Sequence, residues 1–222
     1  MTAYRADLPP RPARMMHLPI DDRGFLVPWF VATVDGKPDF RAIRPSGIAE
    51  AWNKKTCWLC GGPMGVYKAC VVGPMCGVNR ITSEPPCHLE CAEYAAKACP
   101  FLTRPLAVRN ERGMPEGSMA GIGIKRNPGA TLVWVTKDMQ PFKVSKGQGG
   151  GWLFKLGDPV TLQFWARGRR ATRAEVQESV DTGLPILREY AERDGAGAVA
   201  QLEAMIKVFE ALLPSPNFVP KE

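Results

Sequence analysis

Histidine is scarce in this sequence: His17 and His88 are the only two among 222 residues. With only two histidines, the sequence offers few candidates for a general base, and few for a base that would activate a cysteine nucleophile. Long apolar runs are missing too, because no stretch approaches the roughly 20 residues that span a bilayer. Residues 1–7 lack the apolar core of a signal peptide. We therefore expect a cytoplasmic protein that makes no membrane contact.

Cysteine is present in an odd number, seven. Thiols stay reduced in the cytoplasm, so we expect metal ligands and buried thiols instead of a disulfide framework. A hydrophobic content of 45% and a charged content of 23% are ordinary for a globular protein and argue against global disorder. A chain of this length can bury a good core as one domain or two.

Four residues have the types and the spacing of a zinc site. Cys57 and Cys60 form a C-x2-C pair followed by two glycines, and His88 and Cys91 form an H-x2-C pair where a helix should begin. Two such pairs, separated by a stretch long enough for a hairpin, match tetrahedral zinc coordination. We expect one structural Zn2+, since four protein ligands leave no position for a catalytic water. Cys87 adjoins His88, and the sequence leaves open which of the two is the ligand.

The pattern predicts an α+β fold, with the zinc module inserted between β-hairpin and sheet elements and a helical C-terminal segment. Composition divides the chain into five segments, which can still form one compact domain. They are an extended arm rich in proline and arginine (1–20), a β-hairpin with a short helix (21–56), the zinc module (57–104), a basic β-rich region (105–170) and C-terminal helices (171–222).

Two strands and one helix are predicted before the zinc module. Apolar residues favour a strand over 25–34, Asp35-Gly36 favours a two-residue turn, and 40–43 is expected to return as the second strand. A short helix is expected over 47–53, after the N-cap candidate Ser46.

Inside the zinc module, residues 66–72 have strand composition, and residues 78–81 are expected to pair back with them after a break at Gly73-Pro74. Residues 91–99 are alanine-rich and predict a helix that Pro100 closes. The predicted order is therefore knuckle, hairpin and helix, with the last two ligands in the first turn of the helix.

This stretch resembles a treble-clef zinc finger, over about a fifth of the chain. The resemblance implies fold and metal but not function, because that scaffold serves nucleases, ribosomal proteins and protein-binding modules alike. Its HNH nucleases use a histidine base with further histidine or acidic metal ligands. Here the segment between the two ligand pairs contains no histidine, and His17 lies forty residues before Cys57. A metal-dependent nuclease is therefore the weaker alternative, and we expect no catalytic residue.

After the zinc module, residues 131–136 are the best strand candidate, and 152–154 and 160–165 are expected to join them in one sheet. Trp134 and Trp165 are expected to be core residues of that sheet. The cysteines outside the two ligand pairs form no further pair of this spacing, so core packing is expected for Cys70, Cys76 and Cys99.

The C-terminal segment predicts three helices. Thr172-Arg173-Ala174-Glu175 is a capping box, and the helix that it begins is expected to stop at Gly183. A second helix is expected over 184–193, with Pro185 in its first turn. Apolar residues every three or four positions from Val199 onward predict an amphipathic third helix.

Positive charge is concentrated in one region. Residues 105–170 hold eleven lysines and arginines against four acids, whereas residues 171–222 hold five against nine. This asymmetry indicates one cationic surface. Basic residues there, with the glycine-rich loop 147–151 and an exposed Trp152, are expected to contact a nucleic-acid backbone and stack on bases. The candidate contact residues are Lys125, Arg126, Lys143, Lys146, Lys155, Arg167, Arg169 and Arg170.

The whole chain also resembles a set of uncharacterised proteins of bacteriophages and prophages. The resemblance rests on residues 72–75, on Glu84-Pro85-Pro86 with the second ligand pair, and on residues 173–176 through 183–185. It implies a phage context, in which proteins of this size commonly bind host machinery or nucleic acid. A phage protein would act in the cytoplasm of the host cell.

These observations lead to a non-enzymatic, zinc-stabilised protein that binds nucleic acid through its basic surface. The alternative partner is a host protein, such as a defence or transcription component, which the chain would bind and inhibit. No small-molecule substrate is evident from the sequence.

Overall fold

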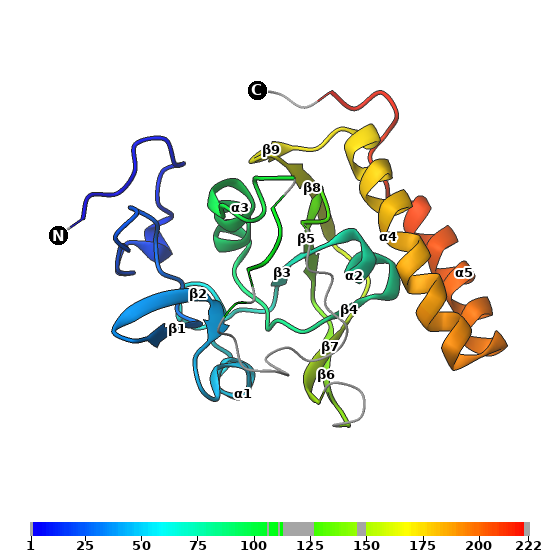
Figure 1. Ribbon diagram of the computed structural model, residues 1–222, viewed down its shortest axis with the longest axis horizontal. Helices are drawn as coiled ribbons and strands as arrows, with labels where there is room; N and C mark the ends of the chain where they lie inside the picture. The colour runs from blue at the N-terminus through cyan, green and yellow to red at the C-terminus, as the bar shows by residue number, and fades with distance from the viewer. Residues whose placement is uncertain (1, 106, 111, 113–126, 146–149, 220–222) are drawn as a thin grey trace.

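The computed structural model describes residues 2–105, 107–110, 112, 127–145 and 150–219. Within them the chain mixes helices with antiparallel sheets, which confirms the α+β class. Figure 1 shows a central sheet with α3 on one side and the α4–α5 pair on the other. The first residues lie beyond the β1–β2 hairpin, on the side away from α4 and α5.

The central sheet has the order β3-β5-β8-β9 and is antiparallel throughout. Its strands are β3 (Lys68–Val72), β5 (Thr131–Thr136), β8 (Thr161–Ala166) and β9 (Arg169–Arg170). Every residue of β5 is buried. Because side chains alternate along a strand, Leu132 and Trp134 enter one hydrophobic core while Val133 and Val135 enter another. The sheet is thus the middle layer between two cores.

One face of the sheet carries what we call the helical core. It is covered by α2 (Pro74–Asn79), α4 (Arg173–Asp194) and α5 (Ala196–Glu210). Phe209 of α5 packs edge-on against Phe164 of β8, with ring centroids 6.5 Å apart. The predicted amphipathic helix and the capping box of Thr172 and Glu175 are both confirmed.

The opposite face carries the metal-side core, formed around α3 (Leu89–Ala98) and the two predicted ligand pairs. Residues from the N-terminal segment complete it. A 3-10 helix, Ala13–Met15, places the Met15 side chain in this core, and Leu18 is buried there too. The expected core position of Trp165 is confirmed on this face, and that of Trp134 on the other.

A second sheet has the order β4-β7-β6. It consists of β4 (Ile81–Thr82), β7 (Gly151–Leu156) and β6 (Met139–Val144). The prediction that 152–154 joins the β5 sheet is wrong, because β7 pairs with β6 and β4 instead. The β6 strand was not predicted, and it contains Pro141, which has no N–H for the strand ladder. As the outer strand of this sheet β6 tolerates the missing N–H.

The N-terminal hairpin joins β1 (Val31–Val34) to β2 (Lys37–Ile43) through a two-residue turn. Asp35 and Gly36 both have positive φ, 50° and 77°, as a hairpin turn of this length requires. The prediction that the first strand begins at residue 25 is wrong. Pro28 has no N–H to donate, and the main chain of Trp29 bonds to Leu59 instead. The helix α1 (Gly47–Asn53) has the predicted bounds.

The segment between the ligand pairs departs from the predicted hairpin. Residues 66–72 and 78–81 do not pair with each other, because β3 pairs with β5 and β4 pairs with β7. Pro74 opens α2 at a position where a helix needs no N–H donor. The chain returns to β3 later, where Ala69 and Cys87 exchange two main-chain hydrogen bonds.

The predicted break at Gly183 is also wrong, because α4 continues from Arg173 to Asp194 through both Gly183 and Pro185. A Cβ atom on Gly183 would lie 2.7 Å from Cγ and Sδ of Met75 in α2. The glycine therefore serves close packing between α4 and α2 and does not end the helix.

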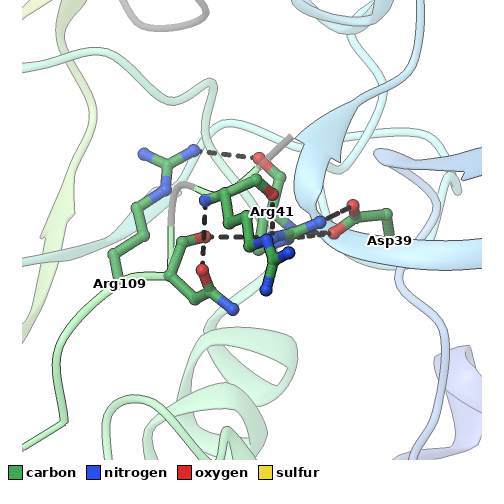
Figure 2. A network of polar contacts seen from close by, with 5 residues as sticks. Asp39, Arg41 and Arg109 are labelled. Carbon is green, nitrogen blue, oxygen red and sulfur yellow. Dashed lines mark hydrogen bonds and ion pairs between the residues drawn. The ribbon is translucent and has the colours of Figure 1, made fainter. Parts of the chain in front are cut away.

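Arginines connect the β1–β2 hairpin to the chain that follows α3. Arg41 donates to the main-chain oxygens of Asn110 and Arg112, and Arg109 donates to the main-chain oxygen of Arg41 (Figure 2). The Asp39 carboxylate accepts hydrogen bonds from the same Arg41 guanidinium, and these bonds lower the pKa of Asp39. These cations are occupied in holding two segments together.

Candidate metal centre

Four donor atoms come together at one point on the metal-side core. The side-chain donor atoms of Cys57, Cys60, His88 and Cys91 all lie within 4.8 Å of one another. His88 Nδ1 is 3.4 Å from Cys60 Sγ and 3.9 Å from Cys91 Sγ. Tetrahedral zinc with bonds of ~2.3 Å to sulfur sets its ligand atoms ~3.8 Å apart. The four residues are therefore close enough to hold one metal ion.

The first ligand pair lies on a tight turn. Cys57 donates its N–H to the Gly62 oxygen, and Gly61 donates to the Cys57 oxygen. Gly61 has φ of +75°, and a Cβ atom there would lie 2.5 Å from the Trp29 ring. Only glycine satisfies both conditions, so the glycine after the C-x2-C pair is part of the ligand turn.

The second pair opens α3. His88 is the N-cap residue of this helix, and Cys91 lies in its first turn, on the buried side. Three residues of separation bring both side chains to the same end of the helix.

The structure distinguishes His88 from its neighbour Cys87. His88 Nε2 donates to the Pro63 oxygen at 2.9 Å, while Nδ1 lies on the side of the sulfurs, 3.4 Å from Cys60 Sγ. The Cys87 thiol instead donates to the Ala69 oxygen at 3.3 Å. Within the described residues, the cluster therefore contains the histidine and excludes Cys87.

An outer layer of hydrogen bonds holds the donors in place. Main-chain N–H groups of Cys60 and His88 donate to Cys57 Sγ, each at 3.4 Å. His17 Nε2 contacts the Cys60 oxygen at 2.9 Å, across 43 residues of sequence. Such partners orient metal ligands and tune their affinity. No spacing rule predicts a contact over this distance, so the role of His17 was missed.

The thiols interact strongly with one another. Hydrogen bonds from Cys60 and Cys91, assisted by main-chain amides, lower the pKa of Cys57 to about 2. The pKa of Cys91 is raised, because its proton is held by the hydrogen bonds to Cys57 and Cys60. One thiolate forms readily and opposes ionisation of its neighbours. A divalent cation removes that opposition, which is the electrostatic condition for metal binding.

The donor set fits zinc. Three sulfurs and one imidazole are a common structural zinc combination, and Cys57 and Cys91 are both 0% exposed. An open groove of about 670 Å³ passes His88, but it is lined by neither cysteine. The chemistry that these residues offer is coordination of one metal ion by four protein donors.

The remaining cysteines are separate from this cluster. Cys70 and Cys76 pack in or against the helical core, as predicted. Burial raises the pKa of Cys76 to about 11 and also raises that of Cys99. These thiols stay protonated near neutral pH, which suits packing and not nucleophilic chemistry.

The predicted nucleic-acid contacts fall in three places. Lys125, Arg126 and Lys146 lie outside the described residues, as does most of the glycine-rich loop. Lys143 and Lys155 belong to the β6–β7 hairpin, and Arg167, Arg169 and Arg170 to the β8–β9 hairpin. Figure 1 places these two hairpins at opposite ends of the view.

Some of these basic residues already have partners. Arg169 donates to both oxygens of Glu175, at 2.9 and 2.8 Å. The Arg170 guanidinium lies over the Trp165 ring, and burial lowers its pKa. Lys143 Nζ is 4.8 Å from the centre of the half-buried Trp152 ring. In the described part of the chain, Lys155 and Arg167 are exposed and form no ion pair.

Comparison of the chain with protein-family models, with curated proteins and with solved structures gives no match. Among the described residues, no helix is both long enough and apolar enough to cross a membrane.

Proposed function

We propose that the four-residue cluster binds one structural zinc ion in a treble-clef-like module. The proposal is supported by the soft donors, by their mutual distances and by the burial of the sulfurs. The turn with Cys57 and Cys60 and the start of α3 would each supply two ligands, as the knuckle and the helix do in that module. The Ala69–Cys87 bridge stands where a hairpin was expected. The metal would then be the link that fixes the knuckle, α3 and the N-terminal segment to one another.

On this support we propose a nucleic-acid-binding protein of phage origin. The observation that carries it is the placement of basic side chains on two hairpins, β6–β7 and β8–β9. Arg167 is at the turn of the second hairpin with φ of 52°, a backbone region that costs an arginine about 1 kcal/mol. A two-residue hairpin loop requires positive φ at both residues, so the fold holds the exposed Arg167 side chain at the tip of this hairpin, where it forms no ion pair with the described residues and is open to a phosphate.

Binding to generic DNA and RNA at increasing salt tests this function. Phosphate contacts release counterions, so affinity should fall steeply as salt rises. Replacing Arg167 with asparagine should relieve the backbone strain, and thus raise stability, while weakening binding. Retained folding with no binding at low salt would contradict the proposal.

A second candidate function, binding of a host protein, is favoured by the groove beside His88. Val66, Tyr67 and Leu89 line it and are 65%, 56% and 40% exposed. A partner protein could cover these apolar side chains. Pull-down from bacterial lysate with and without nuclease separates the two candidates. A nuclease-resistant partner that is captured by the wild type and lost with Tyr67→Asp would favour protein binding.

We propose no enzymatic role. His17, which a nuclease mechanism would have needed as a base, makes its contact with the Cys60 main chain on the metal-side core. Metal-dependent cleavage of nucleic acid that His17→Gln abolishes would contradict this proposal. The variant must keep its metal for that result to count.

A further inference from the structure

The tip of the β8–β9 hairpin packs against the C-terminal end of α3. Arg167 and Gly168 form this tip, and a Cβ atom on Gly168 would lie 3.1 Å from the main-chain oxygen of Lys97. The same atom would lie 3.5 Å from Cγ2 of Thr103, in the turn that follows α3. Three segments that are distant in sequence therefore meet at this end of the molecule.

Two cations from these segments share one aromatic ring. Arg170 pairs directly with Trp165 across the hairpin, so both side chains are on the face of the sheet that α3 covers. The Arg170 guanidinium carbon and the Lys97 Nζ atom each lie 5.1 Å from the centre of the Trp165 ring. The buried ring thus fixes two positive charges beside the hairpin tip.

The turn after α3 adds a further cation. Arg104 is exposed, and its main-chain oxygen accepts a hydrogen bond of 2.9 Å from the buried Asn127 side chain. The same amide group donates to the Leu102 oxygen, so the backbone of the turn is held in place. We use the name α3–hairpin cluster for the four cations Lys97, Arg104, Arg167 and Arg170.

The positive charge of the α3–hairpin cluster is largely uncompensated. Among the described residues, none of its four members forms an ion pair, and the buried Nη1 atom of Arg170 has no hydrogen-bond partner. The Glu93 carboxylate acts on Arg170 but is half-buried and accepts a hydrogen bond from Gln163. The carboxylate of Glu175 is occupied by both terminal nitrogens of Arg169.

The β6–β7 hairpin offers a weaker arrangement of charge. Its two lysines are on opposite faces, since Lys143 pairs with Trp152 and Lys155 pairs with Gln140. Gln140 contacts the Asp138 carboxylate, which therefore lies near the Lys155 side. Charge complementarity to a polyanion thus favours the α3–hairpin cluster over this hairpin.

We infer that the α3–hairpin cluster binds the phosphate backbone of double-stranded nucleic acid. This inference rests on the proposed nucleic-acid function and assigns its site and its strand type. Trp165 is 6% exposed, so the aromatic ring of the cluster is closed to a stacking base. Without stacking the affinity depends on phosphate density, which is highest in a duplex, at one charge per about 1.7 Å.

The test measures fluorescence anisotropy of a labelled DNA duplex and of an oligothymidine of equal length, over a range of salt concentrations. Lys97→Gln, Arg104→Gln and Arg167→Asn should each weaken duplex binding roughly eightfold at 0.1 M salt, because one phosphate contact contributes about 0.9 to the slope of log affinity against log salt. Each should reduce that slope by about 0.9, and the wild type should bind the duplex more tightly than the single strand.

Two matched variants control for the loss of one positive charge elsewhere. Lys155 is exposed on the β6–β7 hairpin and Lys207 is exposed on α5. Lys155→Gln and Lys207→Gln should bind like the wild type. Circular dichroism and zinc content confirm that each variant is folded.

The outcomes separate the inference from the function on which it rests. Duplex binding that the three cluster variants retain would overturn the inference and leave nucleic-acid binding intact, as would tighter binding of the single strand. Millimolar pyrophosphate at constant ionic strength should not displace the duplex. Displacement would overturn the inference, because it would indicate a site for a small anion. No binding of either probe by folded wild type would overturn both proposals.

Discussion

The cores on the two faces of the central sheet differ in the interactions that stabilise them. The helical core is built from α4, α5 and α2, whose apolar side chains bury one another in regular packing. The metal-side core has one helix of ten residues, α3, and many of its other residues lie in turns and loops, such as Met15, Leu18 and Leu26. Turns and loops have no regular apolar face to bury. We therefore expect this core to depend on a metal ion that joins four residues distant in sequence.

This difference shows how one strand can serve two kinds of structure. In β5, Trp134 faces the helices while Val133 and Val135 face the metal side. The helical core should therefore keep its local order when the metal is lost, because its helices pack on each other as well as on the sheet. The metal-side core has no comparable substitute for its ligands.

Loss of the metal should have the largest effect. In zinc-finger peptides a structural zinc contributes on the order of 10 kcal/mol to folding. Cys60→Ser, or a strong chelator, should expose the amides of residues 57–67 and 87–99 to hydrogen exchange while those of α2 and of residues 173–210 stay protected. Mass spectrometry of exchanged peptides provides the measurement. Equal protection of both regions in the metal-free protein would break the comparison.

Truncation of the helical core should have a smaller effect and leave the metal in place. Phe209 is 2% exposed and packs on Phe164 and against Gly77, where a Cβ atom would lie 2.7 Å from its ring. Phe209→Ala should lower the free energy of unfolding by about 3–5 kcal/mol. Denaturant titration measures the loss, and zinc analysis should still find the wild-type content. Loss of zinc with this variant would show that the two cores are not separable.

A charge at the start of α4 should have the smallest effect. The hydrogen bond from Arg169 and the capping box lower the pKa of Glu175 to about 2. Its unfolded pKa is ~4.3, so the stabilisation is complete above about pH 5 and disappears as the pH falls toward 2. Glu175→Gln keeps the cap but removes the charge, and should cost about 1 kcal/mol at pH 7.

The Glu175→Gln result is checked by urea titrations at several pH values. The difference from wild type should shrink on acidification, and zinc content at neutral pH should be unchanged. A difference that persists at pH 2 would mean that packing, and not charge, accounts for the effect.

Local signals in the sequence were sufficient for several elements. Spacing identified the ligand pairs, the Asp35-Gly36 turn gave the first hairpin, and β-branched residues gave the bounds of β5. Thr172 and Glu175 gave the start of α4. In each case the residues that specify the element are close together in the chain.

The missed features depend on contacts between distant residues. Gly183 is inside a helix because Met75 needs the space, and Pro141 is in a strand because β6 has an open edge. β3 and β4 pair with strands more than fifty residues away instead of with each other. His17 reaches Cys60 through the fold of the N-terminal segment. None of these pairings has a signal in local composition.

The central claim is that four named residues hold one metal ion that supports this fold. Native mass spectrometry of the wild type, of Cys60→Ser and of Cys87→Ala tests it most directly, since Cys87 is a buried neighbour of the cluster that bonds elsewhere. We predict one zinc per chain in the wild type and in Cys87→Ala, and well under one in Cys60→Ser. Well under one zinc in the wild type, or equal loss in both variants, would contradict the account.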